Sequence, residues 1–174
     1  RKDCAEMFER FGRTESPDEA HWAVWVCVLS QDGAADWLRV VALAEKAVKS
    51  NPESPVYLNT LGAALYRAGR FEEAVTHLKE ADRLYKSSGE ETLSSAAYVW
   101  FFLAMAHHGL GETEESSKWL DKGVARSDKT FWEHDKHITE AAWNRRLTLK
   151  LLRAEAEAVL GIDENLPVTK ETTK

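Results

Sequence analysis

The sequence predicts an all-α protein built from pairs of helices joined by short turns. Between its proline and glycine residues, apolar side chains recur at helical spacing as far as about residue 160. No stretch shows the strict alternation of apolar and polar residues that is typical of a strand. The sequences of successive helix pairs can also be aligned with one another, with similar residues at matching positions. A single pair cannot bury its apolar face, so such pairs stack on their neighbours.

The composition excludes several classes of partner. Hydrophobic residues make up 44% of the 174 residues and charged residues 30%, and the net charge is −6. An acidic balance argues against nucleic acid or an anionic membrane surface as the main partner. No apolar run, such as that over residues 23–29, approaches the length of a membrane span. We therefore expect no nucleic-acid and no membrane partner.

The cysteines and the first residues favour a cytoplasmic location and a larger parent protein. Cys4 and Cys27 are too few for a disulfide framework, and Cys27 lies in an apolar stretch where a small core residue fits. A reducing, cytoplasmic compartment agrees best with this usage. The chain begins with Arg1 rather than Met, so we expect it to be part of a longer protein.

Residues 4–53 predict three helices. Residues 4–11 form a short helix that ends at Gly12. Ser16 is an N-cap, Pro17 occupies the first turn of the next helix, and Glu19 completes a capping box. A further helix over 35–50 ends before Asn51-Pro52. Its predicted apolar face consists of Leu38, Val41, Ala44 or Glu45, and Val48.

The remaining helices are bounded by similar signals. Ser54-Pro55 begins a helix that ends at Gly69, and the helix over 70–86 ends at Ser87–Gly89. A helix from about Ser94 to Gly109 is followed by a partner that begins at Thr113. The spacing of Thr130 and Glu133 predicts a second capping box, and hence a capping helix over about 131–160. Its apolar face falls at positions 138, 142, 149, 152, 156 and 159 or 160, and a polar tail over 162–174 follows.

Three helix pairs align, at residues 21–53, 54–88 and 95–128. Trp37 aligns with Phe71 at an offset of 34 residues, and Gly69 aligns with Gly111 at an offset of 42. The extra eight residues match the segment "KSSGEETL". A period of 34 is that of the tetratricopeptide repeat. The residues that carry this motif are Leu61, Gly62, Gly69, Ala74 and Ala81 in the central pair, and Trp100, Leu103 and Gly111 in the third.

The chain therefore resembles the tetratricopeptide-repeat family. The resemblance implies a right-handed α-solenoid of three helix-turn-helix repeats with an N-terminal helix and a C-terminal capping helix, within one domain over 1–161. We expect Gly62 and Ala81 to be small because the two helices of a repeat cross there, and Ala74 because the next repeat packs over it. Gly69 fits a turn with positive φ.

The segments "NTLGAALYRAGRFEEA", "FFLAMAHHGLG", "KWLDKGVA" and "LLRAEAEAVLG" extend the resemblance. They are similar to C-terminal repeat segments of planctomycete-type bacterial proteins that carry a Ser/Thr kinase domain or a WD-repeat propeller. This similarity implies a non-catalytic module of a larger signalling or scaffolding protein. The chain itself has no glycine-rich phosphate loop, H-R-D or D-F-G motif.

Proteins of this family usually bind peptides in the concave groove of the solenoid. The alignment of the repeats places ten residues on this groove: Trp25, Leu29, Asn59, Ala63, Tyr66, Arg67, Tyr98, Phe101, Met105 and His108. Most are apolar or aromatic, which favours a hydrophobic peptide or helix as the ligand. The Lys, Arg and Asn clamp that grips a C-terminal carboxylate in the family is missing.

Two other interpretations of the aromatic face remain open. The N-terminal or C-terminal helix of the chain could itself cover Trp25, Tyr98 and Phe101, because large exposed apolar patches are uncommon. Alternatively, the face could pack against another domain of the parent protein or against a second copy of the chain, in a structural or self-association role.

Nothing in the sequence predicts catalysis, a cofactor or a metal. His107 and His108 are adjacent on a helix and point in different directions. His134 and His137 share a face near Glu133, but no further ligand accompanies them, so a solvated start of a helix is the better interpretation. Ser116 lacks a nucleophile elbow and is expected to be a small-residue contact.

Overall fold

The structure is a computed structural model that describes residues 2–30, 33–34, 36–89, 94–135 and 143–162. Within these residues the chain forms eight helices and no strand, so the prediction of an all-α helical-repeat solenoid is confirmed. The helices are α1 (Lys2–Phe11), α2 (Pro17–Val28), α3 (Trp37–Ser50), α4 (Pro55–Arg67), α5 (Phe71–Ser87), α6 (Ser94–Gly109), α7 (Thr113–Asp135) and α8 (Trp143–Val159).

Serine caps and glycine turns set the helix boundaries as the sequence predicts. Ser16 Oγ accepts a hydrogen bond from the Glu19 N–H, and Ser54 Oγ accepts one from the Tyr57 N–H at 3.3 Å. In both helices a proline follows the cap, where its missing N–H costs no hydrogen bond. Gly69 and Gly111 have φ angles of 75° and 76°, a conformation that favours glycine.

The capping box predicted at Ser16 is only half formed. The Ser16 N–H donates to Thr14 Oγ1 at 3.1 Å instead of to the Glu19 side chain. The Glu19 carboxylate accepts a hydrogen bond from the Thr14 hydroxyl. Thr14 therefore lies between the two groups that a capping box would join directly.

The predicted start of the C-terminal capping helix is wrong. Helix α7 runs through Thr130 and ends only at Asp135. The Thr130 hydroxyl donates to the Arg126 carbonyl oxygen at 2.9 Å, as in a helix interior, and Thr130 is buried. The last helix begins at Trp143. Residues 136–142, which include the predicted apolar positions 138 and 142, lie outside the described part of the chain.

The two helices of a repeat cross where glycine replaces a side chain. A Cβ atom on Gly62 of α4 would lie 2.5 Å from Leu78 Cγ of α5. A Cβ atom on Gly123 of α7 would lie 2.8 Å from the ring of Phe101 on α6. Close helix approach, as expected for Gly62, therefore recurs in the next repeat. The motif residues Leu61, Ala74, Ala81, Trp100 and Leu103 are all buried.

The buried face of α3 differs from the predicted one. Val41 and Ala44 are buried as expected, and Val48 is half-buried, but Leu38 is 71% exposed. The core residues of this helix are Val40, Val41, Leu43, Ala44 and Ala47. Leu38 belongs to the first turn of α3, just after its N-cap Asp36, and does not take part in the packing of the helix.

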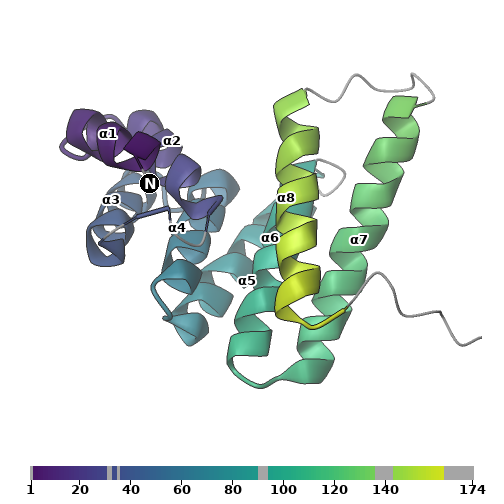
Figure 1. The fold of residues 1–174 in the computed structure, drawn as a ribbon. Helices are drawn as coiled ribbons and strands as arrows, with labels where there is room; N and C mark the ends of the chain where they lie inside the picture. Colours follow the sequence, from purple (N-terminus) through teal and green to yellow (C-terminus); the bar gives the residue numbers. More distant parts are fainter. Residues whose placement is uncertain (1, 31–32, 35, 90–93, 136–142, 163–174) are drawn as a thin grey trace, which may run out of the picture.

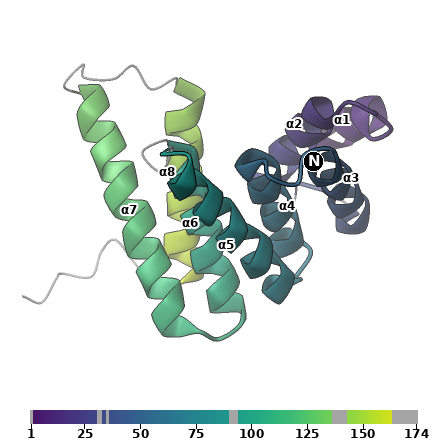
Figure 2. The ribbon, with the colours of Figure 1, turned by 180° about the vertical axis from the view of Figure 1, so that it is seen from behind.

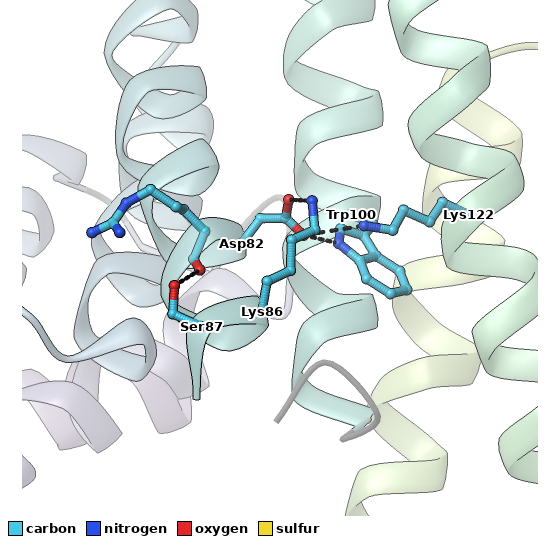
Figure 3. Close-up of polar contacts among 6 residues, drawn as sticks. Asp82, Lys86, Ser87, Trp100 and Lys122 are labelled. Carbon is cyan, nitrogen blue, oxygen red and sulfur yellow. Dashed lines mark hydrogen bonds and ion pairs between the residues drawn. The ribbon is translucent and has the colours of Figure 1, made fainter. Parts of the chain in front are cut away.

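A polar cluster joins α5, α6 and α7 (Figure 3). Asp82 Oδ1 accepts hydrogen bonds from Trp100 Nε1 at 2.6 Å and from Lys122 Nζ at 3.2 Å, and Lys86 Nζ donates to Asp82 Oδ2 at 2.6 Å. The Lys122 ammonium also lies 3.9 Å from the centre of a Trp100 ring. Burial disfavours the Asp82 carboxylate, but the hydrogen bonds from Lys86 and Trp100 outweigh it and lower its pKa.

Helix α8 lies on the inner side of the solenoid. Helices α2, α4 and α6 are the first helices of the three repeats, and α8 packs mainly on α6. In Figure 1, α8 crosses in front of α6 and runs beside α7; in Figure 2, seen from behind, α5 lies on the near side of α6. The two views place α5 and α8 on opposite sides of α6. The last helix therefore occupies part of the concave face.

Candidate partner-binding site

A pocket of about 310 Å³ lies on the inner face, where all three repeats meet the start of α8. It is large enough for one bulky side chain and some water. Helices α2, α4, α5, α6 and α8 all contribute to it. Its lining residues are His21, Trp22, Trp25, Val56, Asn59, Tyr85, Tyr98, Asn144, Arg145 and Thr148.

Aromatic rings form most of the wall. The ring centres of Trp25 and Tyr98 are 5.6 Å apart, and His21 stacks on Trp25 with a centre-to-centre distance of 6.4 Å. Trp25 and Tyr98 are almost buried, whereas Trp22 is 57% exposed. Such a wall offers both flat apolar surface and ring edges to an incoming side chain.

Two polar side chains lie among these rings. His21 Nδ1 is 2.7 Å from Thr60 Oγ1, and burial lowers the His21 pKa to about 4 although the charge of Asp18 raises it. His21 is therefore neutral at pH 7. Asn59 is 96% buried, with 4% of its surface exposed, and its Oδ1 has no hydrogen-bond partner among the described residues. An unpaired buried acceptor is costly, so Asn59 has an unused capacity for a donor.

The start of α8 closes one side of the pocket. The Tyr98 hydroxyl donates to the Arg145 carbonyl oxygen at 3.2 Å, and burial raises the Tyr98 pKa to about 12. The Arg145 side chain is exposed and forms no ion pair with any residue that the structure describes. None of the lining residues that the structure describes is acidic. Among them, Arg145 is therefore a cation at the edge of the pocket that has no carboxylate partner.

A buried ion pair holds the middle of α8 against α4. Arg67 Nη1 and Nη2 donate to the two oxygens of Glu155, and the Nη2 contact measures 2.7 Å. Arg67 Nε also donates to the Val28 carbonyl oxygen at 2.9 Å, and the guanidinium lies over the rings of Tyr66 and Phe102. The Arg67 guanidinium therefore forms its hydrogen bonds within the chain, and α8 covers this part of the groove.

The structure brings three of the ten predicted groove residues into the pocket: Trp25, Asn59 and Tyr98. Ala63, Phe101 and Met105 are completely buried, so their prediction as residues open to a partner is wrong. The Phe101 ring lies over Gly123, inside its own repeat. The other four do not line the pocket: Leu29, Tyr66, Arg67 and His108. The C-terminal helix covers part of the face, as the alternative interpretation supposed.

Sequence reasoning missed seven residues of the pocket: His21, Trp22, Val56, Tyr85, Asn144, Arg145 and Thr148. Trp22 could not be singled out locally, because α2 is apolar on nearly all sides and its exposed side does not show in the sequence. No local signal placed Asn144, Arg145 and Thr148, since they come from α8, whose position depends on packing across the solenoid.

The histidines do not form a metal centre in the part of the chain that the structure describes. No three His, Cys, Asp or Glu side chains gather there in a group that could hold a metal ion. His107 Nδ1 contacts the Glu112 carboxylate, and His137 lies outside the described residues. Ser116 is buried and donates to the Ala104 carbonyl oxygen at 2.7 Å, which agrees with a packing contact.

One further finding concerns membranes: none of the described helices is both long and apolar enough to cross one.

Comparison with known proteins agrees with the repeat register. A family model described as Tetratricopeptide repeat matches residues 52–129, somewhat less than half of the 174-residue chain. This segment contains α4 to most of α7, that is, the second and third repeats. No curated protein matches the chain. The family match therefore supports tetratricopeptide repeats in the segment that the motif residues identified, and such repeats generally mediate contacts between proteins.

Proposed function

We propose that this chain is a non-catalytic protein-binding module that takes one large apolar or aromatic side chain of a partner segment into the pocket of the inner face. The observation that carries this proposal is the exposed Trp22 beside the nearly buried Trp25 and Tyr98, around an open volume. A peptide laid along the whole groove fits less well, because α8 occupies part of it.

Three properties support a protein partner. Aromatic residues are enriched at the centres of protein interfaces, where they fill pockets and exclude water. The repeat family that matches residues 52–129 generally mediates protein contacts. The net charge of −6 disfavours nucleic acid and anionic membranes as partners. Within a larger signalling or scaffolding protein, the module would hold a partner or a neighbouring domain.

Matched tryptophan variants test this proposal. Peptides of twelve residues selected from a random display library would be synthesised, and their binding measured by fluorescence anisotropy. Trp22→Ala removes an exposed wall of the pocket, whereas Trp132→Ala removes a tryptophan of α7 with nearly the same exposure, 56% against 57%, outside the pocket. We expect the first variant to weaken binding at least tenfold and the second less than twofold. Equal effects of the two variants would exclude the pocket as the binding site.

A second role is favoured by the outer face of α8. Trp143, Leu147 and Leu151 follow one another at intervals of four residues and are 72%, 48% and 46% exposed. This spacing places them on one stripe of the helix, an arrangement typical of a helix that packs on another. We propose self-association or docking on a neighbouring domain as the alternative function. Sedimentation velocity of wild type and Leu147→Glu tests it: a dimer that the charge converts to a folded monomer supports the alternative.

A further inference from the structure

We infer that the pocket selects an aromatic side chain with a hydrogen-bond donor, tryptophan above all, within an internal partner segment whose neighbouring residues are acidic. This inference rests on the proposed function and names the chemistry of the partner. It follows from three features of the described part of the pocket: the unpaired acceptor of Asn59, the Arg145 cation without an ion pair there, and the absence of acids among the described lining residues.

The donor requirement comes from Asn59. Asn59 lines the pocket, and its buried Oδ1 has no partner among the described residues, while its neighbours in the lining are mostly rings. A purely apolar anchor would leave this acceptor unpaired after the water has left the pocket. An indole N–H both fills the aromatic space and supplies the missing donor.

The acidic requirement comes from the charges around the opening. Arg145 lies in the first turn of α8, where the helix dipole adds further positive potential. The Asp18 carboxylate accepts a hydrogen bond from the Tyr57 hydroxyl and keeps its negative charge, which acts on His21. An acidic partner residue is therefore expected on the Arg145 side of the opening, away from Asp18. There it would meet an exposed guanidinium and no acid among the described lining residues, so charge complementarity favours a carboxylate at this position.

A side-chain carboxylate fits better than the end of a chain. A terminal carboxylate is usually gripped by several donors, because both of its oxygens need hydrogen bonds. The described lining residues supply one cation, Arg145, on an exposed and adaptable side chain. That arrangement suits an ion pair at the rim of an interface, where Asp or Glu of the partner stays partly solvated.

Capped peptides test each part of this inference. The probe is acetyl-Gly-Ser-Glu-Trp-Glu-Ser-Gly-amide with a fluorescent label at one end, titrated with the protein at about 50 mM salt to limit screening. One comparison peptide has Gln in place of both Glu residues, and one has the indole nitrogen methylated. A third ends in Trp with a free carboxylate. We expect the Glu peptide to bind about threefold to tenfold more tightly than the Gln peptide.

Protein variants then assign the effects to residues. Arg145→Gln should abolish the advantage of the Glu peptide over the Gln peptide. Arg39→Gln, an equal change of charge at an exposed position on α3 outside the pocket, should preserve it. Methylation of the indole nitrogen should weaken binding to wild type several-fold, because it leaves Asn59 Oδ1 unpaired.

The outcomes separate this inference from the proposed function. If Glu and Gln peptides bind equally and Trp22→Ala weakens both, the acidic preference is overturned while the pocket keeps its function. If the free-acid peptide binds more tightly than the capped probe, the assignment to an internal segment is overturned. If Trp22→Ala changes the binding of no peptide, including those selected from the library, the proposed function itself falls.

Discussion

The indole N–H of Trp100 donates to Asp82 Oδ1 over 2.6 Å, which joins the second repeat to the third through a buried hydrogen bond to a charged group. Asp82 is 4% exposed, and its other oxygen is held by Lys86. Hydrogen bonds to charged groups are stronger than neutral ones, and they are costly to break when one partner remains buried. This contact therefore stabilises the packing of the third repeat on the second.

We expect Asp82→Ala to lower the free energy of unfolding by about 2–3 kcal/mol, because the variant leaves the Trp100 N–H unpaired and two ammonium groups without their carboxylate. Urea unfolding monitored by circular dichroism measures this change. Glu80→Ala on the same helix is the control, since it removes only an exposed pair with Arg83 and should cost less than about 0.5 kcal/mol. Similar losses in the two variants would contradict a special role for Asp82.

Gly62→Ala should destabilise the fold by about 1–3 kcal/mol although alanine is the better helix former. Its Cβ would lie 2.5 Å from Leu78 Cγ, and Leu78 is completely buried, so neither helix can yield easily. Gly109→Ala provides a comparison, because its Cβ would meet the ring of Phe71, which is only half-buried and can move. Thermal melts of both variants should show a clearly larger loss for Gly62→Ala.

Acid should destabilise the protein between about pH 6.5 and pH 4 through His21. Burial lowers the His21 pKa in the folded state from 6.5 to about 4, so the unfolded chain binds more protons in this range. The contribution of His21 to stability is complete above pH 6.5, is lost as the pH falls to 4, and amounts to on the order of 3 kcal/mol. The lowered pKa of Asp82 adds a further loss at lower pH.

Chemical unfolding at pH 7.5, 6, 5 and 4.5 tests this assignment with His21→Gln. Glutamine keeps a polar group near Thr60 but does not titrate. The variant should be less stable than wild type at pH 7.5, and its stability should change much less down to pH 4.5. A variant that loses stability as steeply as wild type would show that another group causes the acid sensitivity.

Glu155→Gln should loosen α8 without unfolding the repeats. The change removes the charge that faces the buried Arg67 guanidinium, so we expect a loss of about 2 kcal/mol in the stability of α8 docking. Hydrogen exchange should become much faster in α8 and in its contacts on α4, and should rise by a smaller factor in the first repeat, which Arg67 reaches through the Val28 carbonyl oxygen. Glu114→Gln, at an exposed pair with Lys118, should leave the exchange of α8 as in wild type.

Local signals predicted most of the helix boundaries and the contacts within a repeat. Ser54-Pro55 and Gly69 act through hydrogen bonds and dihedral angles a few residues away, and Gly62 through a repeat motif with a fixed geometry. The predictions based on Thr130 and Phe101 failed for a different reason. The length of α7 and the direction of the Phe101 side chain depend on packing between segments that are distant in the sequence. The Thr130–Glu133 spacing and the alignment of the repeats carry no information about that packing.

The candidate site, like the fold, was predicted only where repeat signals in the sequence determine it. Trp25, Asn59 and Tyr98 follow from the register of the first helices of the repeats, and they do line the pocket. The predicted groove was too long because α8 has no repeat motif to fix its position. Only the folded chain shows that Arg67, which register placed in the groove, pairs with Glu155, 88 residues further along.

That pairing changes how the array as a whole should unfold. In a linear solenoid each unit touches only the next, so the ends can fray while the middle stays folded. Here a guanidinium in the second repeat is bonded to the last helix and to the carbonyl oxygen of Val28 at the end of α2. One residue thus links the first two repeats directly to the last helix, from which the third repeat would separate them in a linear array. Loss of the last helix would therefore weaken the first repeat as well, and the chain should melt as one cooperative unit rather than repeat by repeat.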